Sequence, residues 1–209
     1  MKSNLSLLPL AAALLISFNM DAKKSYIFYA DGVEEVEAVA TVDALRRGGL
    51  EVVTVSIEET PVVTGATGQK LVADSLITQI DPTGAEWIII PGGVPGAPNL
   101  HANERVNEII KQQWAAGGKV AGICAGPAVV LAPTGILKGM KATCYPGLEK
   151  DLEDAGATYV KQPVVVDGRL ITSEGPGTTL QFAGAIIEAT KGAQAATETM
   201  DSMLVPYKD

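Results

Sequence analysis

Apolar runs and amphipathic stretches alternate along the chain, and this alternation predicts strands that alternate with helices. The apolar runs have the length of buried strands, and several end at glycine, proline or another small residue. They cover Ser25–Ala30, Glu51–Ile57, Trp87–Ile90, Lys119–Ile123 and Lys141–Cys144. Helical spacing is found over Glu34–Arg47, Asn103–Trp114, Ala128–Ala132, Gly147–Ala155, Thr178–Thr190 and Ala193–Leu204.

Two further regions predict hairpins. Thr60–Asp74 carries turn glycines between short strand-like pieces and suggests a small flap. Tyr159–Val166 and Leu170–Thr172 flank Asp167-Gly168, a dipeptide typical of two-residue hairpin turns. The turn Asp31-Gly32 is placed to cap the helix that follows the first strand. Alternating strands and helices imply a parallel sheet covered on both faces, with ligands at the carboxyl ends of the strands, and we expect one α/β domain.

Composition and charge limit the classes of partner. The chain has 209 residues, of which 47% are hydrophobic, which is enough for one domain with a sizeable core. Its formal net charge of −8, without a basic patch, argues against nucleic acid and acidic membranes as partners. Two cysteines and one histidine are too few for a disulfide framework or a classical zinc site. We therefore expect no metal and no cofactor.

Residues 1–19 have two interpretations. Lys2 followed by the apolar run Leu5–Phe18 is typical of a secretion signal, and the run is too short to be a convincing membrane span. The cleavage region Ser17–Ala22 lacks a good small-x-small pattern. Alternatively, translation starts at Met20, residues 1–19 are an untranslated leader, and the protein is cytoplasmic rather than exported. In both cases we expect residues 1–19 to lie outside the fold and the domain to cover residues 20–209.

Cys124 is the strongest candidate for chemistry. It stands where the strand Lys119–Ile123 ends, and Pro127 stands where the next helix would begin, a place at which proline is common. The unpaired amides and the positive dipole end of such a helix favour thiolate over thiol. Ala125-Gly126 leaves space around the sulfur, and the tight turn Gly92-Gly93 could bring further amides alongside. This pattern predicts an activated nucleophile with an anion-binding cradle.

Three other side chains are weaker candidates. Glu37 is an acidic residue among apolar neighbours on the first helix, and it is either solvated or partly buried. If it is buried, its pKa rises and it can share a proton with a nearby thiolate. His101 follows a glycine-rich loop and could act as a base, but an exposed residue at a helix start is the simpler interpretation. Cys144 lies in a strand-like stretch and is expected to be a small buried hydrophobe.

Together these segments resemble the ThiJ/PfpI superfamily, within the branch of the Parkinson-associated protein DJ-1. The resemblance runs from about Lys24 to Lys191, and each of its motifs is weak alone but strong in this order. The motifs are Asp31-Gly-Val-Glu-Glu-Val-Glu37, Pro91-Gly-Gly-Val-Pro-Gly-Ala-Pro-Asn-Leu100, Ala121-Gly-Ile-Cys-Ala-Gly-Pro127, Gly135-Ile-Leu-Lys-Gly139 and Ile171-Thr-Ser-Glu-Gly-Pro-Gly-Thr178. A start at Met20 would give a length typical of the family, which favours that start and a cytoplasmic protein.

The resemblance implies a flavodoxin-like three-layer α/β sandwich with a mostly parallel central sheet, like that of class I glutamine amidotransferases, usually as a homodimer. It implies that Cys124 is the reactive cysteine, that the Glu37 carboxyl is hydrogen-bonded to it, and that the amides of Gly93 and Ala125 form an anion hole. The activities attributed to the family need no cofactor. They are a glyoxalase that converts methylglyoxal to lactate, a related protein deglycase, and oxidant sensing through a cysteine sulfinic acid.

Two departures from the family pattern bear on this activity. The residue after the cysteine is Ala125, where the protease branch has a histidine, so we do not expect a peptidase. Tyr145 stands where the human protein of this branch has a histidine near the active cysteine. Proton transfer would therefore fall to Glu37, helped by Tyr145 or by water.

Two hypotheses follow from the sequence. In the first, the protein is a glyoxalase or deglycase that forms a hemithioacetal at Cys124 with a small dicarbonyl compound or a glycated protein adduct. In the second, it is a non-enzymatic sensor of oxidative stress, in which Cys124 is oxidised to a sulfinic acid that Glu37 and the same amides hold. The missing histidine favours the second hypothesis, and the open glycine-rich pocket is compatible with both.

Overall fold

A seven-stranded sheet forms the middle layer of the computed structural model, which describes residues 23–207. The strand order is β10-β11-β7-β6-β1-β2-β5, and every neighbouring pair is parallel except β10 with β11. The strands are β1 (Lys24–Tyr29), β2 (Glu51–Ser56), β5 (Ser75–Leu76), β6 (Trp87–Ile90), β7 (Lys119–Ile123), β10 (Val164–Asp167) and β11 (Leu170–Ser173). The expected mostly parallel sheet is confirmed, whereas the leader predicted over residues 1–19 lies outside the described residues.

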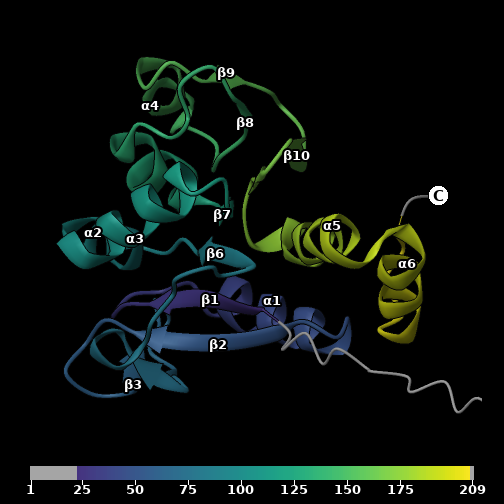
Figure 1. Cartoon of the computed structure of the whole chain (residues 1–209), viewed down its shortest axis with the longest axis horizontal. Coiled ribbons are helices and arrows are strands. Elements are labelled where there is room, and N and C mark those ends of the chain that lie inside the picture. The colour runs from purple at the N-terminus through teal and green to yellow at the C-terminus, as the bar shows by residue number, and fades with distance from the viewer. Residues whose placement is uncertain (1–22, 208–209) are drawn as a thin grey trace, which may run out of the picture.

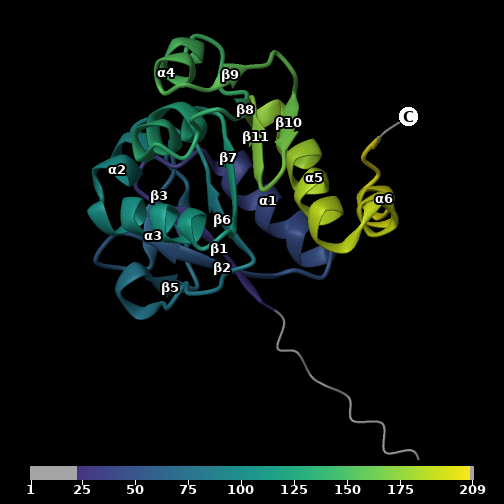
Figure 2. The ribbon, with the colours of Figure 1, turned by 45° about the horizontal axis from the view of Figure 1, so that its top comes forward.

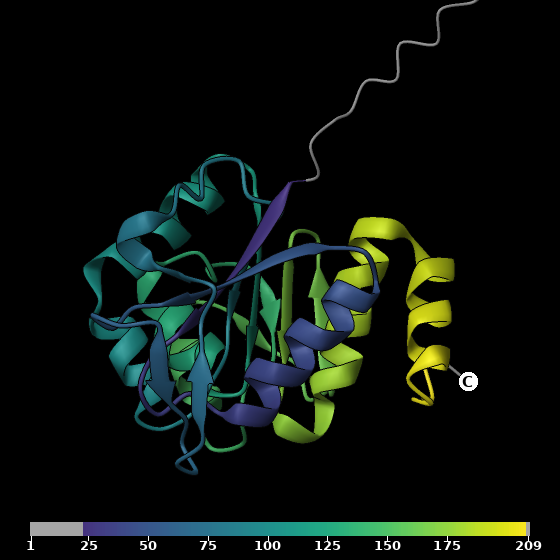
Figure 3. The ribbon, with the colours of Figure 1, turned by 90° about the horizontal axis from the view of Figure 1, so that it is seen from below.

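Helices cover both faces of this sheet, which gives three layers (Figures 1 and 2). The helices of one face pack against one another, as the view from below shows (Figure 3), and they are α1 (Glu35–Arg47), α5 (Thr179–Lys191) and α6 (Ala193–Ser202). The other face carries α2 (Gly96–Ala102), α3 (Glu104–Ala115) and the π-helical segment η2 (Gly126–Leu131). This arrangement is the flavodoxin-like sandwich that the sequence predicts.

Smaller elements surround the three layers. The predicted flap is the antiparallel pair β3 (Val62–Thr64) and β4 (Lys70–Val72). The pair β8 (Lys141–Ala142) and β9 (Thr158–Tyr159) lies near α4 (Glu149–Asp154). Single 3-10 turns form η1 (Ile77–Gln79), η3 (Ala132–Thr134) and η4 (Pro176–Thr178).

The structure differs from the predictions made from the sequence in four local details. The segment predicted as an α-helix over Ala128–Ala132 is the wider η2 followed by η3, because an apolar run indicates burial but not hydrogen-bond register. The strand expected over Lys141–Cys144 has only two residues, and α2 and β5 were not predicted. Asp31 is not the cap of α1, because the Glu34 carboxylate accepts the Glu37 N–H at 2.7 Å in that role. The Asp31 carboxylate instead accepts the Thr64 N–H of the flap at 2.7 Å.

The central strand β6 shows why the sheet is stable. All four of its residues, from Trp87 to Ile90, are fully buried, as expected for a parallel strand covered on both faces. The one polar atom among these side chains, Trp87 Nε1, donates a hydrogen bond to Thr190 Oγ1 at 2.8 Å. Within residues 23–207, no helix is long and apolar enough to cross a membrane.

The order of the strands places a crevice at the centre of the sheet. The chain passes from β1 to β2 on one side and later adds β6 on the other side of β1. At such a switch point the loops after the two strands diverge, which opens a crevice at their carboxyl ends. The turns after β6 and β7, and the helix that follows β1, meet at this crevice.

Candidate active site

Cys124 lies on a sharp turn directly after β7. Its backbone has a φ of 61°, a left-handed conformation that residues other than glycine rarely adopt. Its N–H donates to the Ser173 carbonyl at 2.9 Å, and its carbonyl accepts the Tyr145 N–H at 2.9 Å. These two hydrogen bonds hold a conformation that would otherwise be unfavourable, and such strained residues are concentrated at functional sites.

The turn after β6 is fixed to the start of α1 by two hydrogen bonds. The Gly92 carbonyl accepts the Glu34 N–H at 3.2 Å, and the Gly92 N–H donates to Glu37 Oε2 at 2.7 Å. Gly92 also touches the cysteine, since a Cβ at this position would lie 2.7 Å from Cys124 Cβ and 2.9 Å from its Sγ. A glycine is therefore needed for the sulfur to sit beside this turn.

Glu37 is completely buried. Burial raises the pKa of its carboxyl to about 7, although hydrogen bonds from the Cys124 thiol and the Gly92 N–H act in the opposite direction. While Oε2 accepts the Gly92 N–H, Oε1 is buried without a conventional hydrogen-bond partner, and the Cys124 thiol is the side chain that interacts with this carboxyl. Of the two interpretations that the sequence allowed for Glu37, the buried carboxyl is the one observed.

The pKa of the Cys124 thiol is raised, first by burial and then by the negative charge of Glu37. Hydrogen bonds from the N–H groups of Ala125 and Gly93 act against this and lower the pKa. These amides act in the predicted direction, but burial and the neighbouring carboxylate outweigh them, so that the pKa of the thiol is raised. A thiolate at this site therefore requires a protonated Glu37, and the two groups titrate as a pair.

A pocket of about 430 Å³ opens beside the Cys124 sulfur. Its lining residues are Gly93, Val94, Cys124, Ala125, Tyr145, Pro146, Gly147 and Leu148. The structure thus brings Tyr145 to the mouth of this pocket, where 49% of the residue is exposed. Gly93, Cys124, Ala125 and Tyr145, which the sequence predicts for the site, line this pocket, and Glu37 lies buried against Cys124.

The remaining titratable candidates lie elsewhere. His101 is exposed on α2 and does not line the pocket. Cys144 is only 1% exposed, and burial, followed by the charge of Glu149, raises the pKa of its thiol to about 12. Its position agrees with a small buried hydrophobe.

Comparison with known proteins decides the family. The model of the DJ-1/PfpI family matches residues 23–189. The chain belongs to the DJ-1/PfpI family. Among its relatives is the Glutathione-independent glyoxalase DJR-1.2 of Caenorhabditis elegans, 36% identical over 90% of this chain and 97% of that protein. Protein DJ-1 homolog B of Arabidopsis thaliana is 37% identical over 90% of this chain, but the match covers only 43% of the plant protein. The chain therefore spans less than half the length of that relative.

Solved structures of DJ-1 proteins share the fold. Oxidised DJ-1 of Toxoplasma gondii superposes with a TM-score of 0.85 at 35% identity, covering 89% of this chain and all of that one. DJ-1beta of Drosophila melanogaster superposes with a TM-score of 0.84 at 32% identity, covering 89% of this chain and all of that one.

Some residues of this candidate site could not be recognised from the sequence. Glu34 is the N-cap of α1, and its negative charge contributes to the raised pKa of Glu37. Val94 and Leu148 lie on different segments and meet only in the folded pocket. The Gly-Gly sequence of the turn after β6 indicated that the backbone approaches closely there. It did not indicate that the Gly92 N–H donates a hydrogen bond to Glu37.

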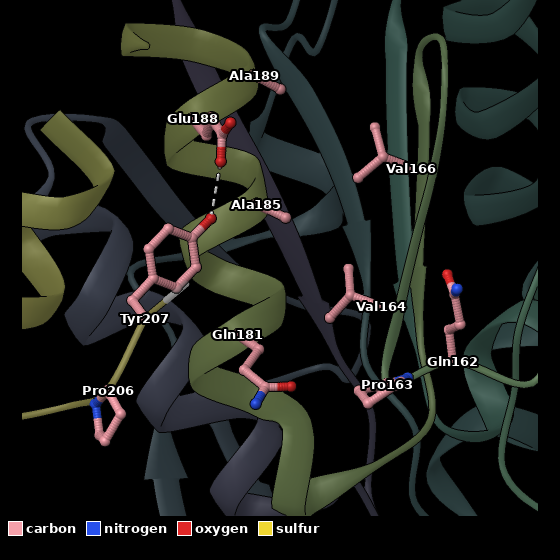
Figure 4. A pocket seen from close by; sticks show the side chains of 10 residues that line it. All are labelled: Gln162, Pro163, Val164, Val166, Gln181, Ala185, Glu188, Ala189, Pro206 and Tyr207. Atoms are coloured by element: carbon pink, nitrogen blue, oxygen red, sulfur yellow. Dashed lines mark hydrogen bonds between the residues drawn. The ribbon is translucent and has the colours of Figure 1, made fainter. Parts of the chain in front are cut away.

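A larger hollow of about 690 Å³ lies apart from this site, between α5 and the edge strand β10 (Figure 4). Val164 and Val166 point toward α5 across it, and the Tyr207 hydroxyl donates to Glu188 Oε2 at 3.0 Å on its other side. None of its lining residues is a cysteine or histidine, so its size does not make it the candidate site.

Replacing Glu37 with glutamine is expected to lower the pKa of Cys124. The substitution removes the negative charge that raises the thiol pKa, so deprotonation should begin at lower pH. The rate of iodoacetamide labelling at Cys124, followed by mass spectrometry across the pH range, should shift to lower pH. The exposed Glu104→Gln variant should keep the wild-type profile, and an unchanged or upward-shifted profile in Glu37→Gln would contradict the coupling.

Replacing Gly92 with alanine is expected to displace the sulfur. The added Cβ would lie within 3 Å of both Cys124 Cβ and the Ala125 nitrogen, so the thiol must move relative to the amides. We expect labelling of Cys124 to slow by about tenfold or more, because reactive groups depend on sub-ångström placement. Gly177→Ala, where a Cβ meets no atom within 4 Å, is the control. Wild-type labelling rates in folded Gly92→Ala would show that the close contact has no role.

Proposed function

We propose that this protein is a cofactor-independent, cysteine-dependent enzyme of the glyoxalase or deglycase type. Its substrates would be methylglyoxal, glyoxal or their adducts. The observation that carries the proposal is the buried pair of Cys124 and Glu37, whose carboxyl has a pKa of about 7 and can accept and return a proton near neutral pH. The C. elegans relative named as a glutathione-independent glyoxalase supports it.

The first step forms a covalent adduct. Glu37 accepts the proton of the Cys124 thiol, and the thiolate attacks the aldehyde carbon of methylglyoxal, while the carbonyl electron pair moves to oxygen. The N–H groups of Gly93 and Ala125 stabilise this oxyanion. Glu37 then returns the proton to the oxygen, which leaves a neutral hemithioacetal.

The second step moves hydrogen between neighbouring carbons. Glu37 removes the proton from the former aldehyde carbon, and the resulting enediolate receives a proton at the former ketone carbon. The aldehyde carbon is thereby oxidised and the ketone carbon reduced, so no external oxidant or reductant is needed. The product is a lactate thioester of Cys124, which water hydrolyses to lactate and the free thiol. Tyr145, at the mouth of the pocket, is the auxiliary that would donate a proton to the ketone oxygen and take one back from the hydroxyl of the former aldehyde carbon, which becomes the thioester carbonyl.

The second candidate function is sensing of oxidants. A peroxide would oxidise Cys124 to a sulfinic acid, and protonated Glu37 and the two amides would hold its oxygens. The superposition with an oxidised DJ-1 of Toxoplasma gondii favours this candidate. Both functions use the same residues, so turnover is the property that separates them.

We also propose that the protein is a homodimer. The apolar face of α1 and the flap exposes large side chains, with Val36 at 52%, Val39 at 50% and Val72 at 71%. Val39 and Val72 line one common hollow, so the two elements form a continuous patch. Apolar patches of this kind on a surface mark protein interfaces.

We also propose that translation starts at Met20 and that the protein is located in the cytoplasm. A reducing compartment would keep Cys124 as a free thiol until a substrate or an oxidant reaches it, and either function requires that thiol. The intact mass of the native protein tests it, because a protein that begins beyond Met20 after signal cleavage would contradict it.

Lactate formation from methylglyoxal tests the enzymatic function. Without glutathione or any other added cofactor, the wild-type protein should produce lactate, and Cys124→Ala should produce none. Glu37→Gln should reduce kcat by at least about a hundredfold, because a positioned acid–base group contributes about 10²–10⁴ to the rate. Absence of turnover in folded protein whose Cys124 still reacts with peroxide would leave the sensing function instead.

An aspartate in the exposed patch tests the dimer. Val39→Asp places a charge in the proposed interface, where it would lose its hydration, so sedimentation should show a dimer for the wild type and a monomer for the variant. The control variant is Val166→Asp on β10, where the valine is about as exposed as Val39, and it should remain a dimer. A monomeric wild type, or a dimer unaffected by Val39→Asp, would refute this interface.

A further inference from the structure

The pocket beside Cys124 is apolar well beyond what a three-carbon aldehyde requires. Its lining includes the apolar side chains of Val94, Pro146 and Leu148 together with Tyr145. None of the lining residues is lysine, arginine, histidine, aspartate or glutamate. The carboxylate of Glu37 lies buried against the sulfur and is not part of this wall.

The wall is built from two separate segments. Val94 follows the Gly93 amide on the turn after β6 and is 74% exposed, so it has little part in the core. Leu148 is half-buried at the start of α4, directly after the Tyr145–Gly147 turn. The Tyr145 ring lies near Gly175, where an ideal Cβ would come within 3.3 Å of its Cδ2. The aromatic ring is therefore backed by the turn before η4.

The volume of the pocket also exceeds the size of a small dicarbonyl compound. At about 430 Å³ it lies within the range of pockets that enclose whole organic ligands. With the aldehyde carbon held at the sulfur, the substituent on the neighbouring ketone carbon is the part of the substrate that extends along the apolar wall. An apolar substituent would be removed from water there, whereas a charged one would lose hydration without a partner.

We propose that the preferred substrates are 2-oxoaldehydes whose ketone carbon bears a bulky apolar group, such as an aryl group, and that Val94 helps to set this preference. The proposal rests on the glyoxalase function proposed above, and it names the class of substrate for that site. Glyoxal has only hydrogen in place of the substituent, so it would make no contact with the apolar wall. Glyoxylate, whose substituent is an anion, is disfavoured by it.

The kinetic test compares phenylglyoxal with glyoxal. We expect kcat/KM for phenylglyoxal to exceed that for glyoxal by about tenfold or more, since even one methylene placed in a hydrophobic pocket contributes about 10- to 200-fold. Val94→Thr keeps the shape of the side chain but replaces one methyl group with a hydroxyl, and it should lower this specificity ratio by about threefold or more. Val166→Thr, an exposed valine outside the pocket, should leave the ratio unchanged. Equal or reversed kcat/KM values for the two aldehydes would overturn the proposal.

A second measurement does not depend on turnover. Cys124 is alkylated with 2-chloro-N-phenylacetamide and with 2-chloroacetamide, and each rate is divided by that of free cysteine. The normalised rate should be several-fold higher for the phenyl reagent, and Val94→Thr should reduce the difference. If no aldehyde is turned over but this preference is present, the glyoxalase function fails while the apolar selectivity of the pocket stands. If turnover is present but neither measurement shows an aryl preference, the substrate class is wrong and the glyoxalase function stands.

Discussion

The hydrogen bond from the Gly92 N–H to Glu37 Oε2, 2.7 Å long, joins the parts of the molecule on which the site depends. Glu37 comes from α1, which follows β1, and Gly92 comes from the turn after β6. Cys124 comes from the turn after β7 and meets both. A carboxyl buried in this way costs free energy when it is charged, so its pKa rises to about 7. The result is a proton shared between an acid and a thiol, and the carboxyl titrates near neutral pH instead of at its ordinary pKa of 4.5.

Close packing of the backbone allows Glu37, Gly92 and Cys124 to come into contact. Gly93 has a φ of 101°, and a Cβ at this position would lie 2.2 Å from the Gly32 carbonyl oxygen. A Cβ on Gly96 would lie 2.6 Å from the same oxygen. Any larger residue would separate the turn after β6 from the start of α1, and Glu37 would then lose its contact with Gly92. Gly93 and Gly96 are therefore needed to hold Glu37 beside Gly92 and Cys124, as well as to form the turn.

The sequence predicted most of the fold because its signals were local. Each buried strand is a compact apolar run, and Cys124 could be placed at the end of β7 from Ala125, Gly126 and Pro127 alone. The role of Glu37 came from family resemblance, since its spacing on α1 did not distinguish a solvated position from a buried one. The direction in which the pKa of Cys124 is shifted could not be predicted from the sequence. It depends on how much of the thiol is buried and on a carboxylate 87 residues earlier in the chain. The pocket wall was missed for the same reason, since Val94 and Leu148 become neighbours only through the sheet topology.

The titration of the Glu37 carboxyl tests directly whether this carboxyl shares a proton with the Cys124 thiol. Carbon-13 labelling of glutamate side chains allows this carboxyl to be followed by NMR, with assignment from the Glu37→Gln spectrum. We expect a pKa near 7 in the wild-type protein, and a higher one in Cys124→Ala, because the hydrogen bond of the thiol lowers it. A Glu37 carboxyl that titrates at its ordinary value of 4.5, or that is unaffected by loss of the thiol, would contradict the shared proton on which the proposed chemistry rests.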